Sequence, residues 1–242
     1  VSNLDYFLIR AEFWRGTSGP DHTRLDNVEI SCNPECDSYL LSAFDTDDEA
    51  WMVQVVHDGL ARLLGVYEPI YRPTGGNPDG YIAQVDPTSH VEYWSAPALF
   101  LANAPHNYGR DLSFDILINL PEGAEAYDND HDIILIGNDL WLIYDLSRPP
   151  VETWTSYSVP LTASGGLIIK STGVPPTEAE MQSVLANLEY ILIRAEFWRF
   201  GSHPDDTGID NVRMGCDMIT AVPEIEPGPV ADIAQARLFH CF

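Results

Sequence analysis

The first 32 residues of the chain repeat a segment that begins 184 positions further along. Aligned without a gap, residues 1–32 and 185–216 share the runs LIRAEFWR and DNV, the pair PD and a final cysteine. An ungapped match of this length indicates a duplicated structural unit, of which the chain carries the closing part twice and the body once. One of the two closing segments must therefore find its partners elsewhere.

Between the two repeats, short runs of β-forming residues alternate with Gly, Pro, Asn and Asp. This spacing is typical of an all-β sandwich. The predicted strands are 39–44, 51–56, 80–85, 91–94, 112–119, 132–136, 140–144, 153–160, 188–198 and 209–214. One helix is predicted over about 178–187, because Thr177 and Glu180 form a capping-box pattern ahead of apolar residues at helical spacing. Residues 217–242 are rich in proline and acidic residues and predict an extended tail whose apolar end docks on the protein.

The chain is strongly acidic, with 37 acidic and 12 basic residues and a formal net charge of −25. A surface of this sign repels nucleic acid and anionic membranes, so neither is expected as a partner. It favours divalent cations, high-salt media or solubility through self-repulsion. No stretch reaches the roughly 20 apolar residues of a membrane helix, and the first residues lack the pattern of a signal peptide. We therefore expect no membrane insertion, with any secretion signal absent from this sequence.

Four cysteines occur, and they match no zinc-binding spacing; they are Cys32, Cys36, Cys216 and Cys241. Three pairings are possible. Cys32 and Cys216 occupy the same position of the repeat, and each has a cysteine downstream, so Cys32–Cys36 with Cys216–Cys241 is the favoured scheme. Disulfides would imply an oxidising extracellular compartment. Four free thiols in a cytosolic protein are the alternative.

An enzyme is not expected, because the sequence contains no nucleophile elbow, no zinc-protease helix and no nucleophile–base pair. Glu12 and Glu196 lie inside apolar runs, but Arg10 and Arg194 lie two residues away on the same strand face and can pair with them. The segment 128–132 resembles an EF-hand loop but has Ile133 at the glycine position, which favours a solvated loop. The glycine-rich segment 74–80 is predicted to be a turn, since no helix or lysine follows it.

The order of several motifs resembles the laminin IV, or laminin B, domain. The motifs are FDTDDEAW at 44–51, YWSAPALFLANAPHNYGRDLSFD at 93–115, DIILIGNDLWLIYD at 132–145, TWTSYSVPL at 153–161, TEAEMQSVLANLEYILIRAEF at 177–197 and IDNVRM at 209–214. The resemblance covers about 37–216, and residues 1–32 match the last part of such a domain. It implies a jelly-roll, galactose-binding-like β-sandwich that is non-catalytic and belongs to extracellular or cell-surface proteins. The implied organisation is a surplus segment at 1–36, one sandwich domain at 37–216 and a tail at 217–242.

The same resemblance implies a structural calcium ion. Jelly-roll domains of this kind often hold Ca²⁺ between the first strand and the last, and the matching positions here are Asp210 with Asp45 and Asp47. Hard oxygen ligands at a crowded acidic edge suit Ca²⁺. The alternative is that Asp210 forms a turn at the entry to a strand.

A glycan ligand is the second binding hypothesis. Trp94, Trp141 and Trp154 are of the aromatic type that stacks on pyranose rings, and carbohydrate-binding modules use similar sandwiches. Aromatic residues in alternating strands can instead be core residues. A calcium-stabilised carbohydrate-binding module is therefore the alternative to a structural or adhesive function.

The surplus segment predicts self-association. The apolar strand at 4–14, with Tyr6, Leu8, Phe13 and Trp14, is not expected to remain unpaired in water. It is a remnant of an adjacent tandem domain, it packs on its own domain, or it completes a neighbouring molecule by strand addition. The last case gives a head-to-tail contact that does not close and builds a filament.

Overall fold

The computed structural model describes residues 40–57, 62–85, 90–120, 126, 131–147, 150–198 and 206–215. The repeated segment at 1–32, the tail at 217–242 and all four cysteines lie outside the described residues, and so do the disulfide scheme and the self-association residues predicted from them. The description that follows concerns the unit spanning Ser38–Asp217.

Runs of apolar residues in this unit form short strands that antiparallel pairing assembles into two sheets. The strands are β1 (Leu40–Ser42), β2 (Met52–His57), β3 (Arg62–Tyr67), β4 (Ile70–Arg72), β5 (Tyr81–Val85), β6 (Val91–Ser95), β7 (Asp111–Asn119), β8 (Ile133–Gly137), β9 (Leu140–Tyr144), β10 (Thr155–Pro160), β11 (Ile168–Ile169), β12 (Leu188–Arg194) and β13 (Asp206–Gly215). The helices are α1 (Ala98–Asn103), the 3-10 helix η2 (Ala104–Asn107) and α2 (Glu178–Ala186). No helix in the described ranges has the length and apolar character needed to cross a bilayer.

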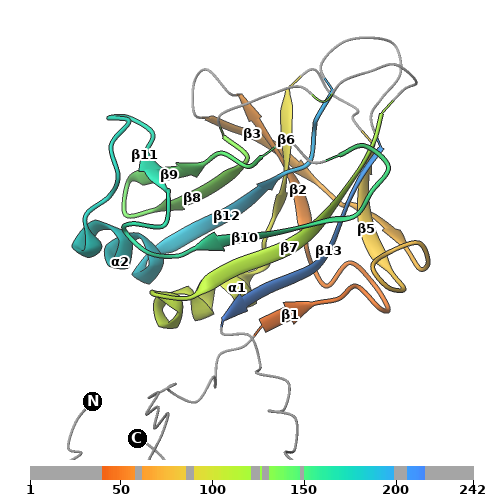
Figure 1. Ribbon diagram of the computed structural model, residues 1–242, viewed down its shortest axis with the longest axis horizontal. Helices are drawn as coiled ribbons and strands as arrows, with labels where there is room; N and C mark the ends of the chain where they lie inside the picture. The colour runs from red at the N-terminus through yellow and green to blue at the C-terminus, as the bar shows by residue number, and fades with distance from the viewer. Residues whose placement is uncertain are drawn as a thin grey trace, which may run out of the picture. The chain divides into compact units, whose positions relative to one another are not determined.

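The two sheets face each other (Figure 1). The first, called here the β7 sheet, has the order β10-β7-β13-β5-β4, with β1 also paired to β13. The second, the β12 sheet, has the order β11-β9-β8-β12-β6-β2-β3. This arrangement confirms the β-sandwich that the strand spacing predicts.

Strict alternation along β7 explains how the core forms between the sheets. Leu112, Phe114, Ile116 and Ile118 are all buried and point to one face, because side chains two apart on a strand share a face. They pack with residues of both sheets in one large apolar cluster. The core therefore lies between the two layers.

The β12 sheet is apolar on its second face as well. A separate cluster contains residues of this sheet alone, at positions that alternate with those of the main core, as Ile134 and Ile136 alternate with Ile133 and Leu135. Strand β12 contributes Ile191 and Ile193 to the main core and Leu192 to the second cluster. Both faces of this strand are thus buried.

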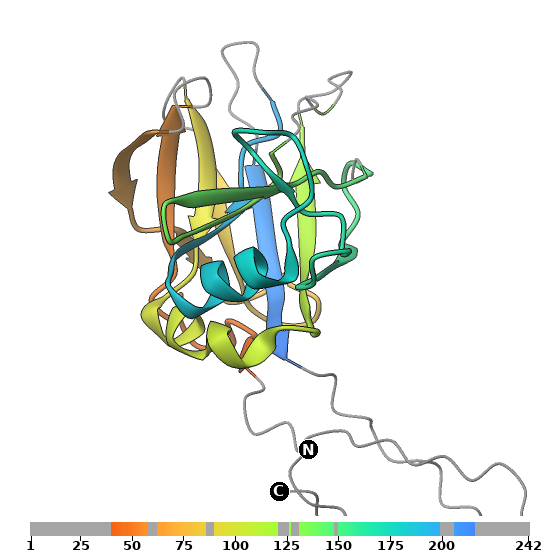
Figure 2. The same ribbon diagram turned by 90° about the vertical axis from the view of Figure 1, so that its left-hand side faces the viewer.

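The predicted helix is confirmed as α2. Thr177 is the N-cap, its side chain accepts the backbone N–H of Glu180, and the Glu180 carboxylate accepts the N–H of Thr177. Met181, Val184 and Leu185 are buried against the main core. Figure 2 shows α2 and α1 together at one end of the sandwich, where they close the space between the layers.

Strands β3, β4 and β11 are not among the strands predicted from the sequence, and all three lie at an end of a sheet. Their side chains have little burial to gain, so the alternation that identifies an interior strand is weak. On β3, Leu64 and Val66 are 42% and 58% exposed. Edge strands of this kind leave little signal in a sequence pattern.

The duplicated block corresponds to the two central strands of the fold. Residues 188–215 contain β12, which lies between β8 and β6, and β13, which lies between β7 and β5 and also pairs with β1. Each sheet therefore takes its middle strand from the repeat.

Candidate functional site

The predicted calcium ligand Asp210 lies in β13 at an interruption of the ladder with β7, where the register shifts between Asp210 and Arg213. The next residue, Asn211, has a φ of 51°. Asp210 is buried, its Oδ2 accepts the backbone N–H of Asn77 at 2.6 Å, and its Oδ1 accepts the N–H of Asn211 at 2.6 Å. Both carboxylate oxygens are thus engaged by backbone donors.

Asn77 belongs to the glycine-rich turn at 74–80, which folds over Asp210 and Asp115. The side-chain amide of Asn77 donates to Asp115 Oδ2 at 3.1 Å. The side-chain amide of Asn211 donates to the same oxygen at 2.9 Å and also to the backbone carbonyl of Asn77. A Cβ on Gly76 would come within 2.8 Å of Asp210 Oδ2, so the turn needs glycine there to approach this closely. The segment is a turn, as the sequence predicts.

Burial raises the pKa of Asp210 to about 6. The N–H groups of Asn77 and Asn211 lower this pKa, whereas the negative charges of Asp115 and Asp45 raise it. The result is a carboxylate held in place by amides next to a second carboxylate. Asp115 and Asn77 were not foreseen, although a polar residue inside the apolar alternation of β7 is a signal that points to Asp115.

The other two predicted calcium ligands have exposed side chains and do not complete a metal site with Asp210. Asp47 is exposed, and its Oδ1 accepts the N–H of Glu49 at 2.9 Å. The backbone carbonyl of Asp45 accepts the Tyr71 hydroxyl at 2.9 Å, while the Asp45 side chain is exposed. Across the described ranges, no group of three or more His, Cys, Asp or Glu side chains is arranged to hold a metal ion. The three aspartates are therefore not a joint set of ligands in this structure, and calcium binding stays a prediction.

The predicted glycan-stacking residues lie in three different environments. Trp94 is fully buried in the main core, so its ring is not accessible to a sugar, and the stacking role predicted for it is wrong. Trp154 is half-buried, packs edge-to-face on Tyr81 with ring centroids 5.3 Å apart, and donates its Nε1–H to the carbonyl of Gly75. Trp141 is half-buried beside the second cluster, with Lys170 Nζ 5.5 Å from its ring centroid. The three rings thus form no common platform.

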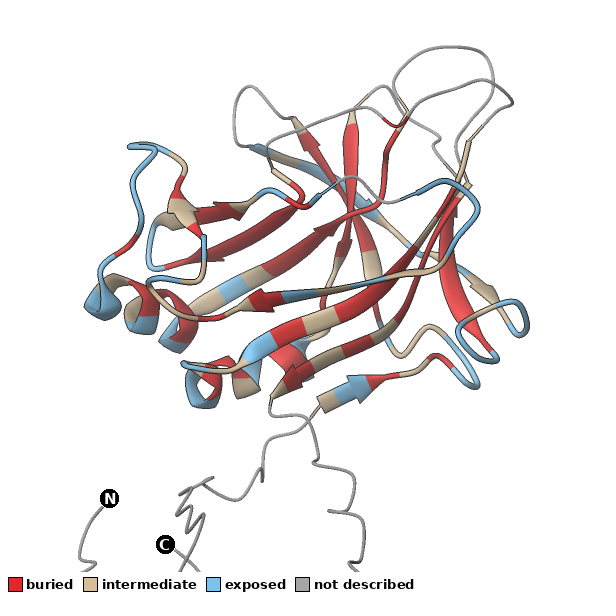
Figure 3. Cartoon of the chain, viewed as in Figure 1, coloured by how far each residue is buried: buried red, intermediate tan, exposed pale blue. Residues whose placement is uncertain are grey.

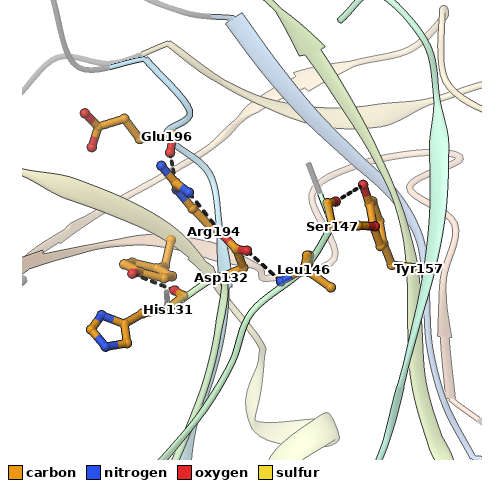
Figure 4. A network of polar contacts seen from close by, with 8 residues as sticks. His131, Asp132, Leu146, Ser147, Tyr157, Arg194 and Glu196 are labelled. Carbon is orange, nitrogen blue, oxygen red and sulfur yellow. Dashed lines mark hydrogen bonds and ion pairs between the residues drawn. The ribbon is translucent and has the colours of Figure 1, made fainter. Parts of the chain in front are cut away.

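Arg194 and Asp132 form a buried ion pair at the β12 sheet (Figure 4). Arg194 Nη1 lies 2.9 Å from Asp132 Oδ1, with the two side chains 3% and 5% exposed. Arg194 Nε donates to the backbone carbonyl of Glu196, and its guanidinium lies 4.7 Å from the Phe197 ring centroid. The sequence pairs Arg194 with the neighbouring Glu196, but the structure gives it a carboxylate from 62 residues away in the sequence.

Asp132 also accepts the backbone N–H of Leu146 through Oδ2 at 2.7 Å. Burial raises the pKa of Asp132 to about 6, although the hydrogen bond and charge of Arg194 lower it. The carboxylate therefore ties β12 to the segment that follows β9. Both charged members of this network are buried, so we interpret its role as structural.

Comparison with known proteins agrees with this architecture. A family model described as laminin B (domain IV) matches residues 93–229, which is more than half of the chain. The solved L4b domain of human laminin alpha-2 superposes with a TM-score of 0.54 at 16% identity, covering 74% of this chain and 97% of that one. CtCBM11 matches with a TM-score of 0.36 at 14% identity, over 70% of this chain and 98% of that one, a similarity too low to support an argument about the fold.

Proposed function

Because the chain belongs to the laminin B (domain IV) family, we propose that it is a non-catalytic structural protein of the extracellular space. We further propose that its copies associate in series through the repeated segment at 1–32. Such an assembly would form a filament or a subunit of a matrix.

The observation that supports this proposal is the position of β12 and β13 in the fold. Each is a central strand, and positions 191–197 are buried without interruption. The residues of the copy that match Tyr190, Leu192, Phe197 and Trp198 are Tyr6, Leu8, Phe13 and Trp14. Leu192 is fully buried and Phe197 is 2% exposed, so the same side chains in a second segment need an equally dry environment.

The domain already contains its own β12 and β13, so these positions are filled. The repeated segment at 1–32 must therefore bind another surface, and we propose that this surface belongs to a neighbouring molecule. Packing on the same domain, or pairing within a longer tandem array, are the competing outcomes.

Light scattering coupled to size-exclusion chromatography tests the proposal on the full chain. We expect the mean mass to rise with protein concentration for the wild type, and Leu8→Asp to abolish this rise by placing a charge on the copy's central strand. Thr17→Asp is the matched control, because it adds the same charge at a position where the repeat differs and should leave assembly intact. A wild type that stays monomeric at all concentrations would contradict association in series.

The alternative function is a carbohydrate-binding module stabilised by calcium. The observation that favours it is the partly exposed ring of Trp141, which lies beside Lys170 on the second face of the β12 sheet. Binding to a glycan array that Trp141→Ala abolishes and the exposed-site change Leu99→Ala preserves would support this function. An array without signal would count against it.

A further inference from the structure

We propose that the open edge of β3, residues Arg62–Tyr67, accepts residues 4–10 of a second copy, which add there as a further strand of the β12 sheet. This inference rests on the proposed function and names the surface that receives the repeated segment. The acceptor is identified from the edges of the two sheets, because strand addition needs a row of unpaired backbone groups.

Among the described residues, five strands have a neighbour on one side only, and four of them are poor acceptors. Strand β11 has two residues, and β1 and β4 have three each, which is too short for a stable added strand. Strand β10 has six residues, but Ser156 and Ser158 are exposed on it and it ends at Pro160, a pattern that discourages pairing.

Strand β3 is different in each of these respects. It has six residues and no proline, and within the part of the chain that the structure describes only β2 pairs with it. That ladder has a register shift at Leu64, and the Gln54 side chain donates to the Gly65 carbonyl at 2.6 Å. Leu64 and Val66 are 42% and 58% exposed, and a Cβ on Gly65 would meet nothing within 4 Å. Figure 3 shows the pale exposed residues along β3 beside the buried β2. This edge is long, apolar and accessible, which is what a protein normally avoids unless the edge is used.

The proposed donor has the properties of a strand that belongs to this sheet. Residues 4–10 read LDYFLIR and match LEYILIR in β12, which pairs antiparallel with both β6 and β8. The parent strand is therefore adapted to neighbours on two sides and to apolar surroundings on both faces. Added to β3, the copy would gain backbone hydrogen bonds and cover the side chains of Leu64 and Val66.

The donor and the acceptor are different parts of the chain, so each bound copy leaves one free donor and one free edge. A heterologous contact of this type extends without closing unless the rotation per copy happens to make a ring. Serial growth follows from one edge and one segment per molecule.

Mixing two disabled full-length variants tests this pairing. Val66→Lys places a charge on the edge and should give monomers, whereas Val174→Lys, at a similarly exposed position away from the edge, should assemble like the wild type. Leu8→Asp disables the donor. A mixture of Val66→Lys with Leu8→Asp retains one good donor and one good edge, so we expect a dimer of the two variants and nothing larger.

Hydrogen exchange of the wild type alone supplies a readout that does not depend on a variant folding correctly. Amides within 62–67 should exchange roughly tenfold or more slowly in the assembled protein than in the same protein diluted until it is monomeric. Unchanged exchange there, or full assembly of Val66→Lys, would overturn the β3 acceptor while leaving serial association in place. A monomeric wild type would overturn the proposed self-association, and the β3 acceptor with it.

Discussion

Replacing Arg194 by methionine is expected to destabilise the folded domain more than any surface change of equal size. The guanidinium and the Asp132 carboxylate are 3% and 5% exposed and lie 2.9 Å apart, so water screens neither of them. Removing the cation leaves a buried carboxylate that keeps its hydrogen bond from Leu146 but loses its counter-charge. Methionine keeps an apolar side chain of similar length against the Phe197 ring, whereas the cation–π contact and the hydrogen bond from Arg194 Nε to the Glu196 carbonyl are lost together with the charge.

The size of the effect follows from the enclosure of the pair. Breaking a buried ion pair by removing one partner costs about 3–5 kcal/mol. In a domain of this size, that corresponds to a fall in Tm of roughly 10 °C. The pKa of Asp132, which burial already raises to about 6, should rise further once Arg194 is gone.

The stability deficit of Arg194→Met should depend on pH in a definite direction. An acid whose pKa is higher in the folded state binds more protons there than in the unfolded chain, so folded stability increases as the pH falls through that pKa. The deficit of Arg194→Met relative to the wild type should therefore be largest at pH 7 and smaller at pH 5. Urea unfolding at the two pH values measures it directly.

Two further variants make the test specific. The double variant Arg194→Met with Asp132→Asn removes the stranded charge, keeps an acceptor for Leu146, and should recover a substantial part of the lost stability at pH 7. Arg62→Met, at an exposed position, should stay within about 0.5 kcal/mol of the wild type. A single variant within about 1 kcal/mol of the wild type, or a double variant no better than the single, would refute the role given to this pair.

Three other expectations concern the Asp210 region and the loops. Asp210→Asn should flatten the gain in stability between pH 7 and pH 5, because the pKa of Asp210 is raised to about 6 and its contribution changes by about 1.3 kcal/mol over that window; exposed Asp139→Asn should keep the wild-type slope in the same unfolding series. Gly80→Ala should cost more than about 2 kcal/mol, since its Cβ would meet a backbone oxygen at 2.1 Å, while Gly65→Ala, with open space, should change the urea midpoint little. Millimolar Ca²⁺ should raise Tm if the predicted calcium ion binds, and an unchanged Tm in a thermal-shift titration would exclude a stabilising ion.

The interior strands of the two sheets are easier to predict from the sequence than the edge strands. Strand β7 was predicted at 112–119 and observed at Asp111–Asn119, because every second residue of this strand faces the core and is apolar. Helix α2 was predicted because its capping box is local. Strands β3 and β4 were missed because exposed edge positions carry no such period.

The candidate sites were harder to predict because their geometry depends on pairs distant in the sequence. The calcium role of Asp210 stays a prediction, and its neighbours Asn77 and Asp115 come from a turn and a strand that only the sheet order brings together. Trp94 is of the residue type that stacks on sugars, but it is a buried core residue. The residue type alone does not distinguish a sugar-binding tryptophan from a core tryptophan. Arg194 likewise pairs across 62 positions rather than with its neighbour on the strand.

The central places of β12 and β13 have a consequence for the order in which the molecule can be made. Strands β6 and β8 are separated by β12, and β5 and β7 by β13, yet these two middle strands are synthesised after all four of their neighbours. The β12 sheet lacks its middle strand until residue 194 is available, and the β7 sheet until residue 215, so folding depends on late, distant pairings and should be slow. Residues 1–32 carry the matching sequence and are synthesised before the body of the domain, so a close relative of both missing strands is already available while the sheets are unfinished.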